Sequence, residues 1–245
     1  MDIVTALDAA TGTTCVVGAG GKKTTMKTLA DRLDRSIVTA TVRIPIFDEW
    51  VDRVAVTPDP VGAVQSQIER EREDEWALGV VPEQEREDRY YGYDPEEIDR
   101  LSEFDLPVFV KADGARMRKF KAPDEHEPRL PRTADTVVSI ASAHVVGEPL
   151  SEEIVHRVDE VVRLTGLEPG DEITAADVAT VLASDEGGRK GLPDGTTMIP
   201  LLNMVDDESL EATAREIAAE IHERVDVPHV VLAEMRADEP LVDIV

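Results

Sequence analysis

A glycine-rich segment with two lysines and two threonines lies near the start of the chain, at Gly18-Ala19-Gly20-Gly21-Lys22-Lys23-Thr24-Thr25. An apolar run precedes it, and residues with helical spacing follow it. Consecutive glycine N–H groups can turn inward around an anion, and the positive N-terminal end of a helix adds to the attraction. A lysine can neutralise the β and γ oxygens of a nucleotide, and a threonine hydroxyl can join the shell of a Mg²⁺ ion. The segment therefore predicts a phosphate loop that binds ATP or GTP with Mg²⁺.

The lysine that contacts the phosphates depends on how this loop is aligned with the usual G-x-x-x-x-G-K-[ST] motif. Gly18 lies five residues before Lys23 instead of six, and Lys22 stands where the second glycine belongs. We favour Lys23 as the phosphate lysine, Thr24 as the metal-side hydroxyl and Lys22 as a second cation. In the other alignment Lys22 is the phosphate lysine. A dinucleotide-binding G-x-G-x-x-G motif, with Lys23 at its third glycine, and a simple glycine-rich turn are the alternatives.

A phosphate loop needs a carboxylate near the metal, and Asp113 is the candidate. It follows the apolar run Leu106–Lys111 and precedes Gly114, so its side chain can reach the carboxyl edge of a sheet. We expect Asp113 to be a metal-side residue and, with Lys23, a catalytic one. The alternative is an ordinary turn, because Asp-Gly pairs are common in turns.

A second polar pair, Asn203 and Asp206, follows the apolar run Thr197–Leu202. The spacing is similar to the Asn-Lys-x-Asp element of GTPases, in which the aspartate accepts two N–H bonds from guanine. Met204 replaces the lysine and can supply apolar contact. We expect Asn203 and Asp206 to contact the base, with ATP and GTP both open; a plain turn is the alternative.

A proline-containing stretch, Phe120–Pro131, follows Asp113 and is expected to form a stiff substrate loop. Lys121 could hold an anion there, and His126, between two glutamates, could titrate near neutral pH. We expect both to contact substrate. The alternative is a rigid surface loop.

Seven short β-branched runs are expected to be strands buried on both faces, namely Thr14–Gly18, Ser36–Thr41, Arg53–Thr57, Leu106–Lys111, Thr136–Ile140, Thr197–Leu202 and His229–Ala233. Helical spacing lies between them, at Thr24–Leu33, Val61–Glu73, Pro95–Glu103, from Ser151, at Thr174–Ala183 and at Ser209–Arg224. This alternation predicts an α/β fold, with a mostly parallel sheet flanked by helices, P-loop NTPase-like and with a small helical cap. We expect a nucleotide-binding core over residues 1–150, a helical cap or subdomain over 151–190, and a return to the core sheet over 191–245.

The charged segment Ile68–Asp105 allows two interpretations. It contains a run of alternating glutamate and arginine and three tyrosines, Tyr90, Tyr91 and Tyr93. It could be a lid or partner-binding insertion with exposed tyrosines. We favour a solvated helix pair whose tyrosine rings pack on the sheet, because charge runs are usually exposed faces.

Composition excludes several classes of protein. The chain has 26 basic and 52 acidic residues and a formal net charge of −26, which argues against a nucleic-acid surface because phosphate affinity needs clustered cations. One cysteine excludes an internal disulfide framework and a cysteine-based zinc site, and no apolar stretch reaches the ~18–20 residues of a membrane helix. We expect a cytoplasmic protein. Only seven of its basic residues are lysine, and this composition is typical of a halophile, in which salt screens the repulsion.

Several segments taken together resemble the YqeC family, whose members are described as accessory proteins of selenium-dependent molybdenum hydroxylases. They are Val17–Lys22, Lys111–Arg116, Phe120–Pro128, Gly147–Leu150, Val155–Arg157, Gly188–Gly191 and Leu202–Asp206. The Lys-Ala-Pro-x-Glu-His-Glu-Pro stretch is the most specific of them. The resemblance implies a role in maturing such a hydroxylase, with the hydroxylase or its cofactor as a partner. Lys22-Lys23, Lys111 and Met204 depart from the family pattern.

Three functions compete at this point. The first, which we favour, is a nucleotide-binding maturation factor with slow hydrolysis of ATP or GTP. The second is a small-molecule kinase or ligase that uses the same loop. The third is a cofactor-binding or chaperone protein that does not hydrolyse nucleotide.

Overall fold

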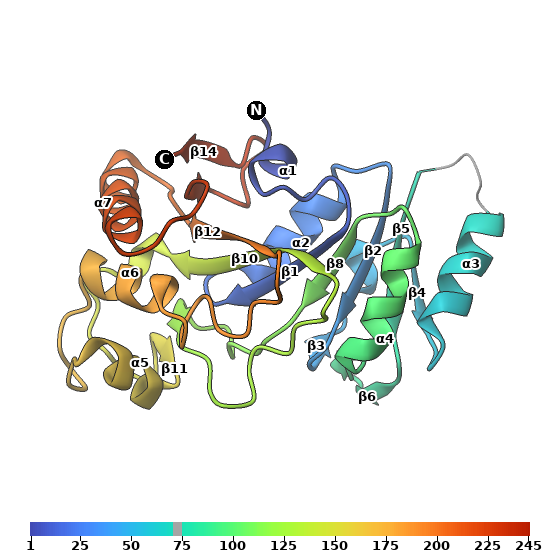
Figure 1. Cartoon of the computed structure of the whole chain (residues 1–245), viewed down its shortest axis with the longest axis horizontal. Helices are drawn as coiled ribbons and strands as arrows, with labels where there is room; N and C mark the ends of the chain where they lie inside the picture. The colour runs from blue at the N-terminus through green and yellow to red at the C-terminus, as the bar shows by residue number, and fades with distance from the viewer. Residues whose placement is uncertain (71–74) are drawn as a thin grey trace.

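The computed structural model describes residues 1–70 and 75–245, and its centre is a twisted sheet of nine strands (Figure 1). The strand order is β14-β13-β12-β10-β1-β8-β2-β5-β4, and all described pairings in this sheet are parallel except that of β13 with β14. The strands are β1 (Thr13–Gly18), β2 (Arg35–Ala40), β4 (Arg53–Val56), β5 (Trp76–Val81), β8 (Val108–Lys111), β10 (Ala134–Ser142), β12 (Thr197–Asn203), β13 (Val231–Ala233) and β14 (Leu241–Ile244). The predicted α/β fold with a mostly parallel sheet and flanking helices is confirmed.

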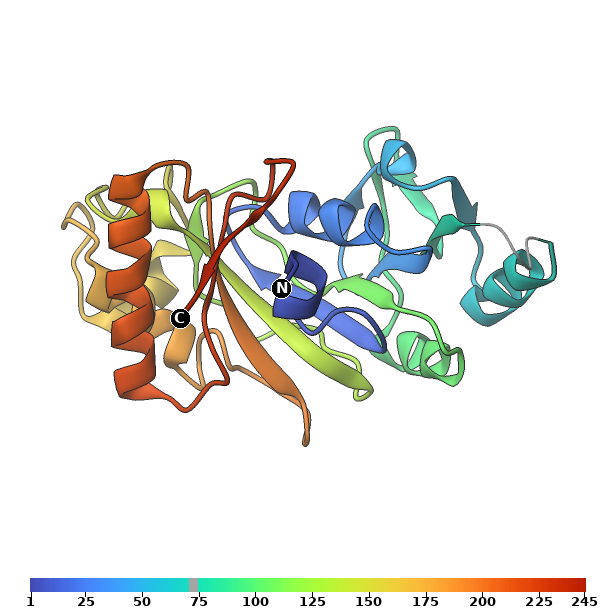
Figure 2. The ribbon, with the colours of Figure 1, turned by 90° about the horizontal axis from the view of Figure 1, so that it is seen from above.

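Helices cover both faces of this sheet. Successive residues of the central strands point to opposite faces, so each strand contacts helices on both sides. Val16 packs with α1 (Ile3–Ala6) and α2 (Lys22–Ala30) on one face. Cys15 and Val17 pack with α3 (Pro60–Arg70) and α4 (Pro95–Asp99) on the other. Farther along, Ala141 and Leu202 pack with α5 (Val158–Thr165), α6 (Ala175–Ala183) and α7 (Glu208–Arg224). Figure 2 shows α7 and α3 at opposite ends of the molecule.

The seven predicted strands correspond to β1, β2, β4, β8, β10, β12 and β13. Six predicted helices correspond to α2 to α7, although the tail of the helix predicted over Val61–Glu73 lies outside the described residues. The predicted start of a helix at Ser151 is wrong. Val155–His156 form a strand, β11, which pairs in parallel with β9 (Phe120–Lys121). Helix α5 begins only after Arg157, whose φ is +64°.

The charged segment Ile68–Asp105 contains a strand of the main sheet, β5, which was not predicted from the sequence. It also contains β6 (Gln84–Arg86) and β7 (Arg89–Tyr90), which form a small sheet with β3 (Ile44–Pro45). Tyr90 and Tyr93 are buried, so a lid with three exposed tyrosines is wrong. The favoured pair of helices is also incomplete, because strands lie between α3 and α4. Glu71 to Asp74 of the charge run lie outside the described residues.

The remaining elements are short 3-10 turns, η1 (Asp48–Trp50), η2 (Arg100–Glu103) and η3 (Ala143–Val145). Residues 151–190 contain β11, α5 and α6, and α6 packs against α7. The predicted division of the chain near residues 150 and 190 stays a prediction. None of the helices in the described ranges has the length and apolar character needed to cross a membrane.

Candidate functional site

Four segments that are distant in sequence meet at the carboxyl edge of the sheet. Strands β12, β10, β1 and β8 are parallel neighbours, so their carboxyl ends lie side by side. Gly18 ends β1, Ser142 ends β10, Asn203 ends β12, and Asp113 follows β8 by two residues. In open parallel sheets, ligands bind at this edge. Most of the predicted site residues therefore lie where such a fold places its chemistry.

The glycines of the loop are required by its backbone and by its neighbours. Gly18, Gly20 and Gly21 have φ values of +85°, +102° and +131°, a region that side chains rarely adopt. A Cβ atom on Gly18 would lie 2.2 Å from the Ile140 carbonyl oxygen, and one on Gly20 would lie 2.6 Å from the Ser142 nitrogen. The Ala19 N–H also donates to the Ile140 carbonyl at 2.9 Å. The loop is thus packed tightly on the end of β10.

Lys22 is the first residue of α2, and its ammonium lies inside the loop that precedes it. The side chain is 5 % exposed, donates to the Gly18 carbonyl oxygen, and lies 2.8 Å from Oδ1 of Asp113. Burial lowers the pKa of Lys22, and the carboxylate of Asp113 opposes that shift. Lys22 therefore connects the first glycine of the loop to the strand that carries the predicted metal-side carboxylate.

Asp113 is a buried carboxylate held by two lysines and one backbone N–H. Its Oδ2 accepts a hydrogen bond from the Gly18 N–H at 2.8 Å and lies 3.0 Å from Lys121 Nζ. Its Oδ1 has the ion pair with Lys22 but accepts no well-aligned hydrogen bond from the described residues. Burial raises the pKa of Asp113, but Lys22 and Lys121 outweigh it, and the net pKa is lowered to about 2. The group is an ionised carboxylate at neutral pH.

Lys121 joins this ion pair to the proline-containing loop. Its ammonium is buried, donates to the Gly114 carbonyl at 2.6 Å, and is paired with Glu127. Glu127 in turn pairs with Arg157, which lies 2.6 Å from Asp124 Oδ2. Neither Glu127 nor Arg157 is among the site residues predicted from the sequence. Both lie in segments that resemble the family, Glu127 in the specific Lys-Ala-Pro-x-Glu-His-Glu-Pro stretch and Arg157 in Val155–Arg157, and this was the available signal.

Lys111 is a third lysine in the same cluster. It is buried, and its ammonium donates to the carbonyl oxygens of Arg43 at 2.9 Å and of Asp113 at 2.7 Å. Burial, together with repulsion from Lys22, lowers the pKa of Lys111 to about 7. The buried cluster therefore carries more lysine than carboxylate around Asp113.

Asn203 and Asp206 occupy different surroundings. Asn203 is buried, its amide donates to the Gly20 carbonyl at 2.7 Å, and its oxygen accepts from the Met235 N–H at 3.1 Å. Asn203 thus anchors the glycine loop to the end of β12. Asp206 is largely exposed and lies 3.0 Å from His144 Nε2. The predicted contact of this pair with a base stays a prediction.

The other predicted residues lie in the first turn of α2 or in the proline-containing loop. The Lys23 ammonium lies 5.9 Å from the ring centroid of Trp50, and Thr24 is partly exposed in the first turn of α2. The Thr25 hydroxyl donates to the Gly21 carbonyl at 3.2 Å. His126 is exposed, with its Nε2 3.2 Å from Oε1 of Glu125, whereas Lys121 is buried. No cluster of three or more histidine, cysteine or acidic side chains arranged for a metal occurs among the described residues.

The lysines of this chain are concentrated at this edge. Six of the seven lysines lie at or near this edge. Lys22 and Lys23 follow the glycines of the loop, Lys111 lies in β8, Lys119 and Lys121 follow β8, and Lys190 donates to the Asp124 carbonyl. The exception is Lys27, which pairs with Asp31 on the surface of α2. The carboxyl edge is therefore rich in lysine in a chain with a twofold excess of acidic residues.

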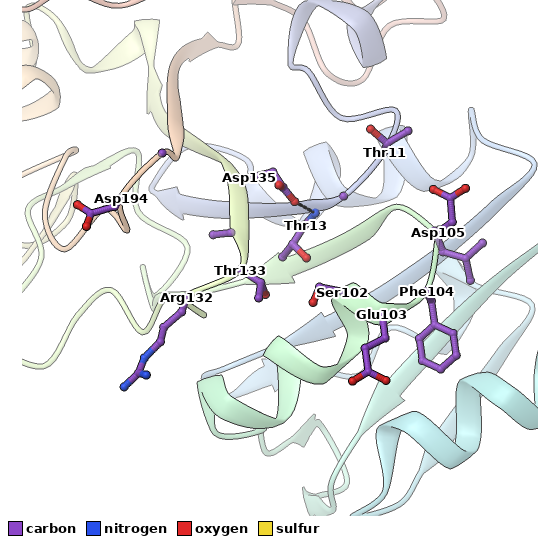
Figure 3. Close-up of a pocket in the computed structure, with 14 residues that line it drawn as sticks. Thr11, Thr13, Ser102, Glu103, Phe104, Asp105, Arg132, Thr133, Asp135 and Asp194 are labelled. Carbon is purple, nitrogen blue, oxygen red and sulfur yellow. Dashed lines mark hydrogen bonds between the residues drawn. The ribbon is translucent and has the colours of Figure 1, made fainter.

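An open pocket of about 600 Å³ lies at the opposite, amino edge of the sheet (Figure 3). It is bordered by the residues that precede β1, β8, β10 and β12. Its charged side chains are Glu103, Asp105, Arg132, Asp135 and Asp194. None of the predicted site residues lines this pocket.

The sheet, the glycine loop and the helix after it define an α/β protein with a P-loop-like arrangement. The model of the family described as YqeC protein matches residues 14–159, more than half of the chain, and the chain belongs to this family. It is also 29% identical to a protein of Escherichia coli (strain K12) described as "Uncharacterized protein YqeC". The aligned region is 196 residues long and covers 77% of this chain and 74% of that protein. No solved structure matches the chain.

Proposed function

We propose that this protein binds ATP or GTP with Mg²⁺ at the glycine loop and acts as an accessory factor in the maturation of a selenium-dependent molybdenum hydroxylase. The observation that carries the nucleotide part is the Lys22 ammonium, held inside the loop and 2.8 Å from the ionised Asp113. A buried cation at a loop of glycine N–H groups is an arrangement that suits phosphate oxygens. The site lies at the carboxyl edge, where a parallel sheet offers its ligands a crevice.

Lys22 is our candidate for the phosphate lysine, with Lys23 as the outer cation. Lys22 is enclosed by the loop and donates to its first carbonyl, whereas the Lys23 ammonium lies over Trp50. This is the second of the two alignments considered from the sequence, and it leaves Lys23 at the position where the motif has serine or threonine. Thr24 is then our candidate for the metal-side hydroxyl, because the Thr25 hydroxyl already donates to the Gly21 carbonyl.

The residues present suit a Mg²⁺ ion next to the nucleotide. Asp113 supplies an ionised carboxylate whose Oδ1 accepts no well-aligned hydrogen bond from the described residues, and Thr24 supplies a hydroxyl. Magnesium prefers such oxygen ligands and, when bound, would neutralise charge on the β and γ phosphates. In exchange, Asp113 would give up its contact with Lys22, and the freed ammonium would turn to the phosphates.

The maturation role rests on family membership together with the described role of the family. The cytoplasm is the compartment that suits it. Its direct test is to delete the gene in a host that makes a selenium-dependent molybdenum hydroxylase. We expect hydroxylase protein to accumulate with less active cofactor, and restoration by the wild-type chain. Normal hydroxylase activity in the deletion strain would contradict this part of the proposal.

A non-hydrolysing binding protein is the second candidate, and one observation favours it. Both oxygens of Asp113 already face lysines, so a metal must compete with two buried ion pairs. A chain of this kind would bind nucleotide and keep it intact. A kinase or ligase would instead turn nucleotide over rapidly when its acceptor is present.

Calorimetry with Mg-ATP and Mg-GTP in multimolar KCl tests the nucleotide proposal. The high salt is needed because a chain of charge −26 repels itself in dilute buffer. We expect one nucleotide to bind, and the choice of base assigns the role of Asp206. Slow phosphate release would then indicate a hydrolase, and no release a binding protein. Failure of both nucleotides to bind a folded protein would overturn the proposal.

A further inference from the structure

The loop between β8 and β9, residues Gly114–Lys119, is the most basic exposed segment of an acidic chain. From Lys111 to Lys121 the sequence has five basic residues and one acidic residue, whereas the whole chain has half as many basic as acidic residues. Lys111 and Lys121 are buried in the site already described. The other three, Arg116, Arg118 and Lys119, are at least partly exposed. They form what we call the basic loop.

The backbone of the basic loop is held in an unusual conformation. Arg116 and Met117 have φ values of +45° and +62°, which non-glycine residues adopt rarely and at a cost. The Arg118 N–H donates to the Ala115 carbonyl at 2.8 Å and closes the turn. Met117, at its tip, is 89 % exposed. A strained turn that exposes these side chains is typical of a functional segment rather than of packing.

The basic loop borders the glycine loop directly. The Lys119 N–H donates to the Ile154 carbonyl at 3.0 Å, and the Lys119 carbonyl accepts from the Ser142 N–H at 3.1 Å. A Cβ atom on Gly20 would lie 3.0 Å from that same carbonyl oxygen. A ligand held by the glycine loop would therefore have the basic loop as its neighbour.

Two of the three cations of the basic loop have no acidic partner among the residues that the structure describes. Arg116 and Arg118 form no ion pair with any residue in the described ranges, and the Lys119 ammonium lies 3.8 Å from Glu148. His156, which faces Lys121 across the β9–β11 pair, reports the local charge. Burial, followed by the charges of Lys121, Arg157 and Arg116, lowers the pKa of His156 to about 4.

We infer that Arg116, Arg118 and Lys119 bind a phosphate or carboxylate group of a second small ligand beside the glycine loop. This inference rests on the proposed function in one respect: the nucleotide proposed for the glycine loop is the first ligand, and the anion held by the basic loop is the second. A small anion suits the loop better than an acidic protein does. A small anion meets only the local cations, whereas a large acidic surface also meets the remaining carboxylates of a −26 chain and is repelled by them.

Inorganic pyrophosphate is the probe, applied to the full-length protein. Four proteins are compared by calorimetry: wild type, Arg116→Gln/Arg118→Gln, Lys22→Met, and the control Arg53→Gln/Arg132→Gln. The control removes the same charge from Arg53, at the start of β4, and Arg132, at the amino-edge pocket. We expect the basic-loop variant to bind pyrophosphate about 10-fold more weakly, the loss of roughly one charge-assisted bond, and the control to bind as the wild type does.

Histidine NMR locates the anion, because the chain has only five histidines. We expect pyrophosphate to raise the pKa of His156 in the wild type and in Lys22→Met, but not in the basic-loop variant. If this His156 response is observed while neither nucleotide binds, the inference stands and the proposed function is overturned. A His156 response lost in Lys22→Met and kept in the basic-loop variant would place the anion in the glycine loop and overturn the inference. Binding of polyglutamate without binding of pyrophosphate would overturn it in favour of an acidic protein.

Discussion

The two edges of the central sheet differ in charge and in shape. The carboxyl edge holds Lys22, Lys111 and Lys121 around one buried aspartate, and the cavity beside Gly18, Asp113 and Lys121 is only about 10 Å³. The amino edge holds an open pocket of about 600 Å³ with four carboxylates and one arginine (Figure 3). In a chain with 52 acidic residues, four carboxylates at a surface pocket carry little information. Buried lysines are rare in any protein, so we give them more weight than the volume in choosing the candidate site.

The closed carboxyl edge also has an energetic consequence. Lys22 and Asp113 neutralise each other where a phosphate and a metal are proposed to bind. An incoming ligand must replace both halves of this pair, because a lone buried charge is costly. We therefore expect binding of the nucleotide and of the metal to be strongly interdependent.

The largest contrast between the edges should appear when one carboxylate is neutralised at each. Asp113→Asn leaves Lys22 buried without its carboxylate partner and Lys121 with Glu127 alone, and should lower the free energy of unfolding by about 3–5 kcal/mol. Asp135→Asn, at the amino edge, weakens one hydrogen bond to the Thr13 N–H and should cost about 1 kcal/mol. Chemical unfolding in multimolar KCl measures both. Equal costs would contradict the comparison.

The cost of Asp113→Asn should also depend on pH. The folded pKa of about 2 lies below the ordinary value of 3.8, so the carboxylate stabilises the fold above about pH 4, and this stabilisation is lost as the pH falls toward 2. The difference between wild type and variant should shrink over that window.

A pair of glycines separates backbone strain from close packing. Gly18 and Gly195 have nearly equal φ values, +85° and +84°. A Cβ atom on Gly18 would meet the Ile140 carbonyl at 2.2 Å, whereas one on Gly195, at the amino-edge pocket, meets no atom within 4 Å. We expect Gly195→Ala to cost about 1–2 kcal/mol of unfolding free energy from strain, and Gly18→Ala about 2 kcal/mol more from the clash. Similar losses for the two variants would show that the loop is not tightly packed.

Lys111 should make stability depend on pH near neutrality. Its folded pKa of about 7 lies below the ordinary value of 10.5, so between these values the unfolded chain binds one more proton than the folded chain does. Stability should therefore rise with pH from about 7 to 10.5, by up to about 1.4 kcal/mol per unit. Lys111→Met should reduce this rise to the part that Lys22 contributes, because burial also lowers the pKa of Lys22, whereas the surface variant Lys27→Met should keep it whole. A rise undiminished in Lys111→Met would assign it to other groups.

The smallest expected effect is that of Lys23. Its contact with Trp50, at 5.9 Å, is worth about 0.5–1 kcal/mol, and we place Lys23 outside the phosphate contacts. Lys23→Gln should weaken nucleotide binding less than about 5-fold. A complete loss in Lys23→Gln, with binding kept in Lys22→Met, would restore the alignment favoured from the sequence.

The sequence predicted the strands whose residues are buried on both faces, because such strands are continuous β-branched runs. It missed β5, since Trp76–Val81 follows a charge run that favoured exposed helices. It also placed a helix from Ser151, where the apolar spacing of Ile154 and Val155 is equally compatible with a strand. Pairing of β11 with β9 decides the outcome, and a partner so distant in sequence leaves no local signal.

The site shows the same limit. The glycine loop and Asp113 could be proposed from the sequence because each belongs to a spacing with a known mechanism, and the structure brings them to one edge. The anchoring of Gly20 by Asn203 and the pairing of Lys121 with Asp113 could not be derived, since both depend on which strands are neighbours. Burial of Lys22 rather than Lys23 depends on where α2 begins, which a doubled lysine leaves open.

Nucleotide binding by wild type, Lys22→Met and Lys27→Met, measured by calorimetry with Mg-ATP and Mg-GTP in multimolar KCl, tests the central claim most directly. Lys27 lies on the same helix but away from the loop, paired with Asp31. We predict that wild type and Lys27→Met bind one nucleotide equally, and that folded Lys22→Met binds it about 10- to 100-fold more weakly, as loss of a charge-assisted contact requires. Equal binding by all three proteins, or no binding by the folded wild type, would contradict the assignment of the carboxyl edge as a phosphate site.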